Sequence, residues 1–83
     1  MRRPAVHRVL LYARAGCHLC DVARESLLSL RERAGFEFEE VDIERDETLE
    51  LEYGIRIPVV EIDGEEVFEV TVDPTELARL VGS

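Results

Sequence analysis

The chain has 83 residues, of which 46% are hydrophobic and 35% are charged, and its formal net charge at pH 7 is −9. This length allows one domain with one modest core, and the composition is typical of a folded domain that is neither disordered nor membrane-spanning. The negative charge argues against a nucleic-acid partner, because binding to phosphates requires a basic surface.

The first predicted elements are a strand and a long helix joined by a short loop. Residues 7–12 form an apolar run of strand length, and residues 13–16 form the loop. A helix follows, because apolar side chains recur at intervals of three and four residues. These side chains are Leu19, Val22, Ala23, Leu27, Leu30 and Ala34. Gly35 is placed to end this helix as a left-handed C-cap.

A second strand and a short second helix are predicted next. Residues 36–43 alternate between apolar and acidic side chains but slip phase at Glu40. This pattern fits either a strand with a bulge or a strand whose two ends bury different faces, and we expect it at the edge of the sheet. Residues 46–53 are a helix candidate, with Asp46 as the N-cap and Gly54 as the terminator.

The last third of the chain predicts a hairpin and a final helix. Residues 59–62 and 65–70 are strands separated by Asp63-Gly64, a two-residue turn that requires positive φ at both positions. Asp73 then provides an N-cap, and Pro74 occupies the first position of the helix. The apolar face of this helix comprises Leu77, Leu80 and Val81.

The resulting order of elements, βαβαββα, predicts an α/β domain. The first crossover implies two parallel strands, and the hairpin must add antiparallel strands to the same sheet. We therefore expect residues 1–83 to form a single domain with a four-stranded mixed sheet and helices on both of its faces.

The two cysteines, Cys17 and Cys20, carry the clearest chemical signal. Cys17 falls at or beside the N-cap of the first helix, where unpaired N–H groups and the positive helix end lower the pKa of a thiol. Cys20 lies one turn later on the same face, placed to attack a mixed disulfide on Cys17.

A zinc site would need a second pair of ligands at similar spacing. Neither His18, which points in a different direction, nor His7 supplies one, so no metal ligands are predicted.

The surroundings of this pair favour a redox interpretation. Residues 1–35 carry a net charge of +4 and residues 36–83 carry −13, so the cysteines lie in the basic part of the chain, which would favour a thiolate if the charges are close in space. The apolar run at residues 9–13 is too short for a membrane span or a secretion signal. We therefore expect a cytoplasmic protein. Because cytoplasmic thiols are kept reduced, two close cysteines there indicate a catalytic or metal-binding pair more readily than a permanent disulfide.

Three further positions allow both a functional and a plain interpretation. An imidazolium at His18 would raise the thiolate fraction of Cys17, but His18 is equally an ordinary polar residue on the first helical turn. Arg14 either binds a substrate carboxylate or is a loop residue without a role in binding. Pro58 either simply begins the third strand or follows a cis bond that leaves the backbone of Ile57 open to an extended substrate.

The segments LLYARAGCHLCDVA and YGIRIPVVEIDG together resemble the glutaredoxin-like branch of the thioredoxin superfamily. The shared features are C-x-x-C after the first strand, a proline about forty residues later, and a strand that leads into an Ile-Asp-Gly hairpin. The resemblance spans nearly the whole chain and implies a thioredoxin-like fold with strand order 2-1-3-4. It also implies that Cys17 is the nucleophile, Cys20 the resolving thiol, and Pro58 a cis-proline opposite them.

Further roles in substrate binding are implied by the same resemblance. Ile57 would offer main-chain hydrogen bonds to a bound thiol peptide, and Arg14 would meet a glutathione carboxylate. Tyr12 matches the aromatic residue that closes the first strand.

The sequence also departs from glutaredoxins. These proteins usually have Pro-Tyr between the cysteines, where this chain has His18-Leu19. The Gly-Gly-Asp turn that they use for the γ-glutamyl end of glutathione is replaced by Phe68, Glu69 and Val70. Only Asp73, displaced slightly, would serve there. The pattern fits best with small glutaredoxin-like proteins that lack the glycine pair.

The leading functional hypothesis is a thiol–disulfide oxidoreductase in which Cys17 attacks a disulfide of a protein or small thiol and Cys20 resolves the product. Glutathione or a thioredoxin-type reductase would be the reductant, and no tightly bound cofactor is implied. All ten Lys or Arg residues are arginine, which excludes lysine-based catalysis. The alternatives are a non-catalytic binding module or redox sensor, a metal carrier, and a stable fold with an idle cysteine pair. We expect a monomer without membrane partners.

Overall fold

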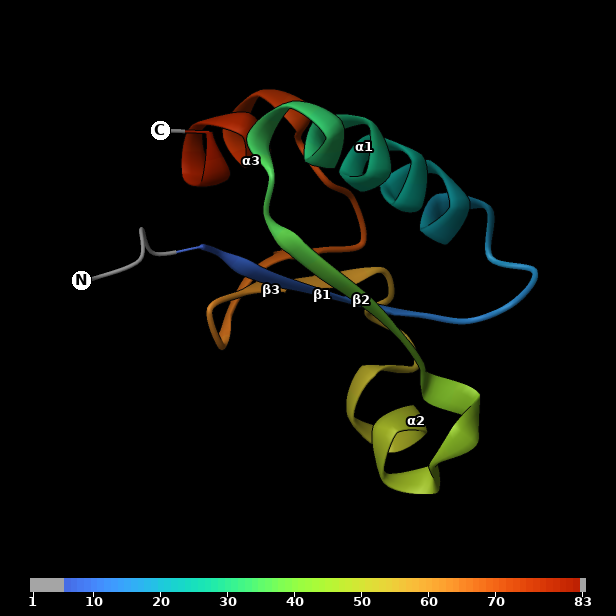
Figure 1. Ribbon diagram of the computed structural model, residues 1–83. Helices are drawn as coiled ribbons and strands as arrows, with labels where there is room; N and C mark the ends of the chain where they lie inside the picture. Colours follow the sequence, from blue (N-terminus) through green and yellow to red (C-terminus); the bar gives the residue numbers. More distant parts are fainter. Residues whose placement is uncertain (1–5, 83) are drawn as a thin grey trace.

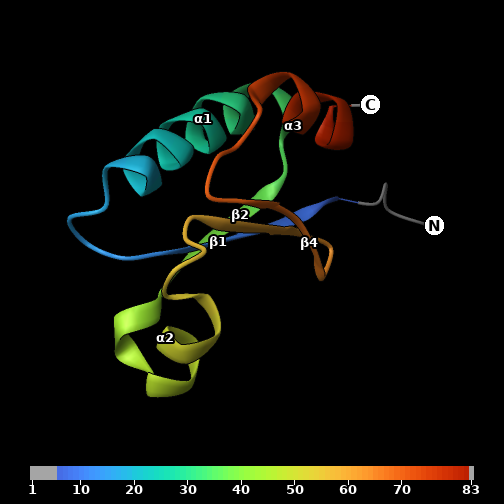
Figure 2. The same cartoon turned by 180° about the vertical axis from the view of Figure 1, so that it is seen from behind.

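A computed structural model of the protein describes residues 6–82. The elements in chain order are β1 (Arg8–Ala13), α1 (His18–Ala34), β2 (Glu37–Asp42), the 3-10 helix η1 (Ile43–Arg45), α2 (Glu47–Tyr53), β3 (Val59–Ile62), β4 (Glu65–Glu69) and α3 (Pro74–Val81). The strands form one sheet in the order β2-β1-β3-β4. Figure 1 shows α1 and α3 side by side over one face of the sheet and α2 below one end of the other face, and Figure 2 shows the same layers from behind. The predicted order of elements and the mixed α/β sheet are confirmed.

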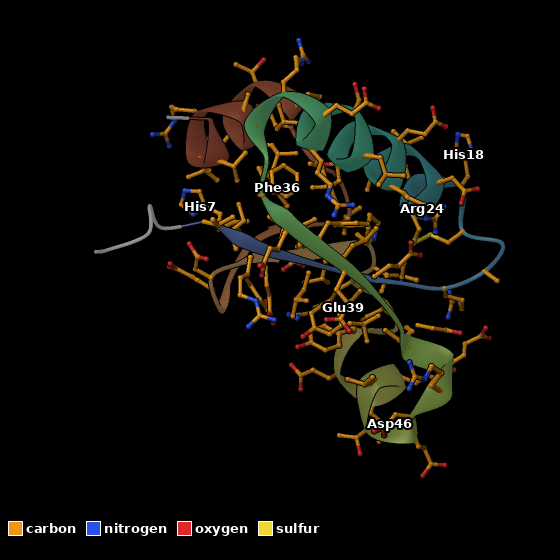
Figure 3. All side chains as sticks on the ribbon, viewed as in Figure 1. His7, His18, Arg24, Phe36, Glu39 and Asp46 are labelled. Atoms are coloured by element: carbon orange, nitrogen blue, oxygen red, sulfur yellow. A yellow bond between two sulfur atoms is a disulfide. The ribbon has the colours of Figure 1, made fainter. Side chains whose placement is uncertain are left out.

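The sheet is organised around β1. This strand pairs in parallel with β2 and antiparallel with β3, and β3 pairs antiparallel with β4. Side chains on one face of β1, namely Val9, Leu11 and Ala13, are almost completely buried. They face the layer of α1 and α3, where Phe36 also points (Figure 3). Leu10 and Tyr12 alternate onto the other face, toward α2.

The buried stripe of α1 includes only part of the apolar pattern seen in the sequence. Cys20, Ala23 and Leu27 are its buried residues, whereas Leu19 and Val22 are 43% and 48% exposed. Neighbouring residues point about 100° apart around a helix, and here Cys20 rather than Leu19 faces the sheet. The periodic pattern therefore predicts the helix correctly, but Leu19 and Val22 lie at the exposed border of its apolar face.

The phase slip in the second strand arises because the two ends of the strand bury different faces, which is one of the two predicted explanations. The register between β1 and β2 is continuous from Arg8 and Glu37 to the end of both strands, so β2 has no bulge. Phe38 pairs with Val9 and faces α1, whereas Val41 lies three residues later, on the opposite face of the sheet. The register irregularity of the sheet lies instead between β3 and β4. The edge position of β2 is confirmed.

The predicted turns and caps are present. Asp46 and Asp73 cap α2 and α3, and each side chain accepts a backbone N–H of the first turn. Gly35 ends α1 with a φ of 72°, and the hairpin residues Asp63 and Gly64 have φ values of 54° and 87°. These local signals therefore set the ends of the elements as the sequence indicates. No helix among residues 6–82 combines the length and apolarity needed to span a membrane.

Two adjacent leucines of α1 give a test of the core. Leu27→Ala should lower the free energy of unfolding by about 2–5 kcal/mol, because it removes buried methyl groups and leaves a cavity under the helix. Leu28→Ala is the matched control, since Leu28 is 41% exposed, and it should change stability by about 0.5 kcal/mol or less. Urea unfolding followed by circular dichroism measures both. Equal losses in the two variants would contradict this packing.

Candidate active site

Cys17 is the N-cap residue of α1. Its backbone is extended, with φ −97° and ψ 109°, and its sulfur accepts the N–H of Cys20 at 3.2 Å. The sulfur therefore occupies the place of the oxygen in an ordinary N-cap side chain. A thiolate formed there would accept the same N–H group and would be stabilised by the positive end of the helix dipole. The predicted position of the pair is confirmed.

The two sulfurs form a disulfide but differ in accessibility. Cys17 and Cys20 are joined across Cα atoms 5.2 Å apart. Cys17 is half-buried at the helix end, whereas Cys20 is completely buried in the core. An external thiol or disulfide consequently reaches Cys17 before Cys20. The assignment of the nucleophile and the resolving thiol stays a prediction, and this asymmetry agrees with it.

The strand pairing brings the Ile57-Pro58 segment to the cysteine loop. Tyr12 pairs with Val59, so Pro58 lies next to Ala13, from which the loop at residues 14–16 leads to Cys17. The Ile57–Pro58 peptide bond is cis, as the resemblance implied, and Pro58 is fully buried. Ile57 belongs to the same buried cluster as Cys20, and Cys17 packs against that cluster.

The backbone of Ile57 is only partly free. Its N–H donates to the carbonyl of Tyr53 at 3.1 Å. Within residues 6–82 no hydrogen bond reaches its carbonyl oxygen. The predicted role of Ile57 in binding an extended substrate can therefore use the carbonyl in this conformation, whereas the N–H is already occupied.

Tyr12 lies on the opposite face of the sheet from α1. Its ring stacks on Tyr53 of α2, with centroids 4.2 Å apart and planes inclined by 17°. Burial, the neighbouring hydroxyl of Tyr53 and the negative charge of Glu61 raise the pKa of Tyr12 above its ordinary value. The guanidinium of Arg56 stacks over the ring of Tyr53, 5.2 Å from its centroid, and Nη2 of Arg56 lies 3.1 Å from Oε2 of Glu66. Tyr12 therefore anchors α2 and the segment that precedes Pro58.

The other predicted site residues differ in how free they are. Arg14 is half-buried in the loop and forms no ion pair within the part of the chain that the structure describes. His18 is exposed and points away from the sheet (Figure 3). Asp73 is exposed, but its Oδ1 accepts the N–H groups of Thr75 and Glu76 at 3.0 and 3.4 Å. The side chain of Asp73 thus already caps α3.

The arginine nearest the pair on α1 is neutralised by acidic partners. Arg24 lies one turn after Cys20, on the side of the helix toward β2 (Figure 3). Its Nε and Nη2 donate to Glu40 at 2.6 Å each, and its Nη1 donates to Asp21 at 2.7 Å. These carboxylates raise the pKa of Arg24. At Arg24, the predicted positive charge beside the cysteines is therefore neutralised by the two carboxylates. In the cysteine loop, Arg14 keeps a positive charge that is unpaired within residues 6–82.

Sequence reasoning missed two residues beside the site. The stack of Tyr53 on Tyr12 had no sequence signal beyond the aromatic residue itself, because it depends on how α2 folds against the sheet. Val70 has a φ of 70°, and a β-branched residue is the last that a sequence pattern would place there.

No group of three or more His, Cys, Asp or Glu side chains within residues 6–82 is arranged to hold a metal ion.

A Cys-x-x-Cys pair at a helix N-terminus, next to a cis-proline in a mixed sheet of order 2-1-3-4, defines a thioredoxin-fold dithiol protein. A thioredoxin mutant from Halobacterium salinarum has this fold, with a TM-score of 0.68, 24% identity, and coverage of 90% of this chain and 71% of its own. The protein XcR50 from X. campestris is 38% identical with a TM-score of 0.73, over 90% of this chain and 97% of its own. An uncharacterized Mycobacterium tuberculosis protein, Rv0508, is 37% identical over 80% of this chain and 70% of its own.

Residues 8–82 match the glutaredoxin-like domain family (DUF836), and the chain belongs to this family. A glutaredoxin-like, thioredoxin-fold domain with a Cys-x-x-Cys pair supports a redox function in general.

The two tyrosines give a pH test of the packing around the site. Tyr12 and Tyr53 are the only tyrosines of the chain, and the pKa of each is raised, chiefly by burial. Phenolate absorbance should therefore rise only at a pH above the ordinary tyrosine pKa of about 10. Because the folded state favours the neutral phenols, the stability that they contribute is fully present below about pH 10 and is lost as the pH rises beyond this value.

The Tyr53→Phe variant isolates Tyr12 in this titration. The variant removes the neighbouring Tyr53 hydroxyl, which helps to raise the pKa of Tyr12, but leaves the burial of Tyr12, so this pKa should fall and still exceed 10. Absorbance at 295 nm measures the change. An ordinary tyrosine titration in the folded wild type would contradict the half-buried stack.

Proposed function

We propose that the protein is a thiol–disulfide oxidoreductase that works through the Cys17–Cys20 pair. The observation that carries this proposal is the asymmetry of the pair: an accessible N-cap sulfur joined to a buried sulfur one helical turn away. An N-cap sulfur is stabilised as a thiolate, the nucleophilic form. The buried sulfur is protected from outside reactants but remains within reach of its partner.

The exchange balances in two steps. The Cys17 thiolate attacks one sulfur of a substrate disulfide, forms a mixed disulfide, and releases the other half of the substrate as a thiolate that takes up a proton. Cys20 then loses its proton and attacks the Cys17 sulfur, which releases the second substrate thiol. Two electrons have passed to the substrate, and the protein is left as the Cys17–Cys20 disulfide. A thiol or dithiol reductant returns it to the dithiol form.

Neighbouring residues have proposed supporting roles. Arg14 lies in the loop directly before the N-cap without an acidic partner in the described residues, so it is available for a substrate carboxylate. His18 is exposed next to Cys17, where an imidazolium would favour the thiolate. The carbonyl of Ile57 beside Pro58 would accept a backbone N–H of an extended substrate. Tyr12 acts from the other face of the sheet, through α2, rather than by contact with the sulfurs.

The proposal extends to substrate and setting. The substrate would be a disulfide of a protein or small thiol, and the reductant would be glutathione or a thioredoxin-type reductase. The chain would work as a monomer in the cytoplasm, without a tightly bound cofactor. Asp73 would meet glutathione only through its second carboxylate oxygen, because the first already caps α3.

A peptide-binding module without turnover is the second candidate. The unoccupied carbonyl of Ile57 beside a buried Pro58 favours it, since backbone pairing alone can hold an extended peptide. Cys17→Ser separates the two candidates, because it abolishes exchange and leaves backbone pairing in place.

The first test is equilibration with graded ratios of glutathione to glutathione disulfide, followed by intact mass spectrometry. The wild type should lose two hydrogens together at one ratio, which reports the reduction potential of the pair. Cys20→Ser should instead accumulate a single glutathione adduct on Cys17, because the resolving thiol is absent. Cys17→Ser should form neither product, since Cys20 is buried. A wild type that stays a dithiol throughout and forms no adduct would exclude the redox proposal.

A further inference from the structure

Val70, directly after β4, has an unfavourable backbone conformation. Its φ of 70° lies in the left-handed region, which a β-branched side chain rarely adopts. The N–H of Thr71 donates to the carbonyl of Glu69 at 2.8 Å, so Val70 is the central residue of a three-residue turn. A γ-turn with positive φ at its centre is the rare, strained form. Asp63 in the hairpin is the only other non-glycine residue with positive φ among residues 6–82.

This turn is attached to the cis-proline segment. The N–H of Val70 donates to the carbonyl of Pro58 at 2.9 Å and to that of Arg56 at 3.0 Å. These two carbonyls flank Ile57, the residue whose own carbonyl is free. The backbone of Val70 is therefore held directly against the segment that lies beside the cysteine loop.

The Val70 side chain does not offset this strain by packing in the core. It is 41% exposed and is absent from the buried cluster and from the side chains packed against it. Glycine would adopt the same turn without strain. A strained residue that contributes nothing to the core points to a role at the surface that its side chain faces.

We propose that Val70 is a specificity-determining residue that forms an apolar wall of the substrate groove beside Pro58. It selects extended peptides that carry an apolar side chain next to their disulfide cysteine. Leu19, between the two cysteines, is 43% exposed and adds apolar surface on the α1 side. This inference rests on the proposed function, and Val70 itself takes no part in the exchange of sulfur partners.

The charge beside the turn disfavours glutathione in the same place. Glu69 directly precedes Val70 and is exposed. Glutathione carries a net negative charge, so its carboxylates would lie near a like charge, which lowers affinity. An apolar wall with an acidic border therefore fits a neutral or basic peptide with an apolar residue beside its cysteine.

The test compares exchange rates of the reduced protein with three small disulfides. The probes are glutathione disulfide and the disulfide-linked dimers of two blocked tripeptides, Val-Cys-Val and Ser-Cys-Ser. The wild type should react faster with the valine peptide than with the other two. Val70→Gly should slow the valine peptide about tenfold relative to glutathione disulfide, the size expected for one lost apolar contact. The same variant should raise the melting temperature, because it relieves the strained turn.

A matched control and a conservative variant isolate the side chain. Asp63→Gly relieves the other positive φ at the far end of β3 and should leave the preference among the three disulfides unchanged. Val70→Ile keeps an apolar wall and should retain the preference for the valine peptide.

The outcomes separate the inference from the proposed function. A wild type that exchanges with all three probes at rates that Val70→Gly leaves in the same ratio would overturn the role of Val70 while the oxidoreductase stands. A Val70→Gly variant that melts lower and slows all three probes equally would make Val70 a structural residue and would also overturn it. No exchange by the wild type with any probe would remove both proposals.

Discussion

The antiparallel pairing of β1 with β3 is the interaction on which the site depends. Cys17 and Pro58 are far apart in the sequence, and each alone is an ordinary feature of a loop. The pairing of Tyr12 with Val59 brings the end of β1 and the start of β3 together, so the cysteine loop and the cis-proline segment meet at one edge. The buried side chains of β1 stabilise this arrangement, because their removal from water holds the central strand beneath α1.

The N-terminus of α1 places positive electrostatic potential at the cysteines, whereas the charge of Arg24 is compensated by its own partners. The N-cap position supplies a backbone N–H and the positive end of α1. Arg24, the basic residue one turn along, is shared between Glu40 and Asp21. Those carboxylates leave little of its charge for the sulfurs. The excess of arginine in the first part of the chain therefore matters less than composition indicates, because each cation acts according to its partners.

The backbone around Ile57 and Pro58 is held in place by α2 and by the turn after β4. The carbonyl of Tyr53 accepts the N–H of Ile57, and the Tyr12–Tyr53 stack attaches α2 to the sheet. On the other side, Val70 donates to Pro58. The segment around Pro58 is thus held from both directions, which reduces the entropy that would be lost if this segment had to become ordered on binding a ligand.

The sequence by itself determined the elements, their ends and the position of the cysteine pair at the start of α1. Aspartate N-caps, Gly35 and Asp63-Gly64 act through local backbone geometry, which a short stretch of residues specifies without help from the rest of the chain. Tertiary structure alone decided which neighbour in α1 is buried, because Cys20 and Leu19 are both acceptable in the core and the fit to the sheet selects one. It also decided the pairing of Arg24 with Glu40 and the conformation of Val70. Long-range hydrogen bonds and ion pairs impose these features, and no local pattern encodes them.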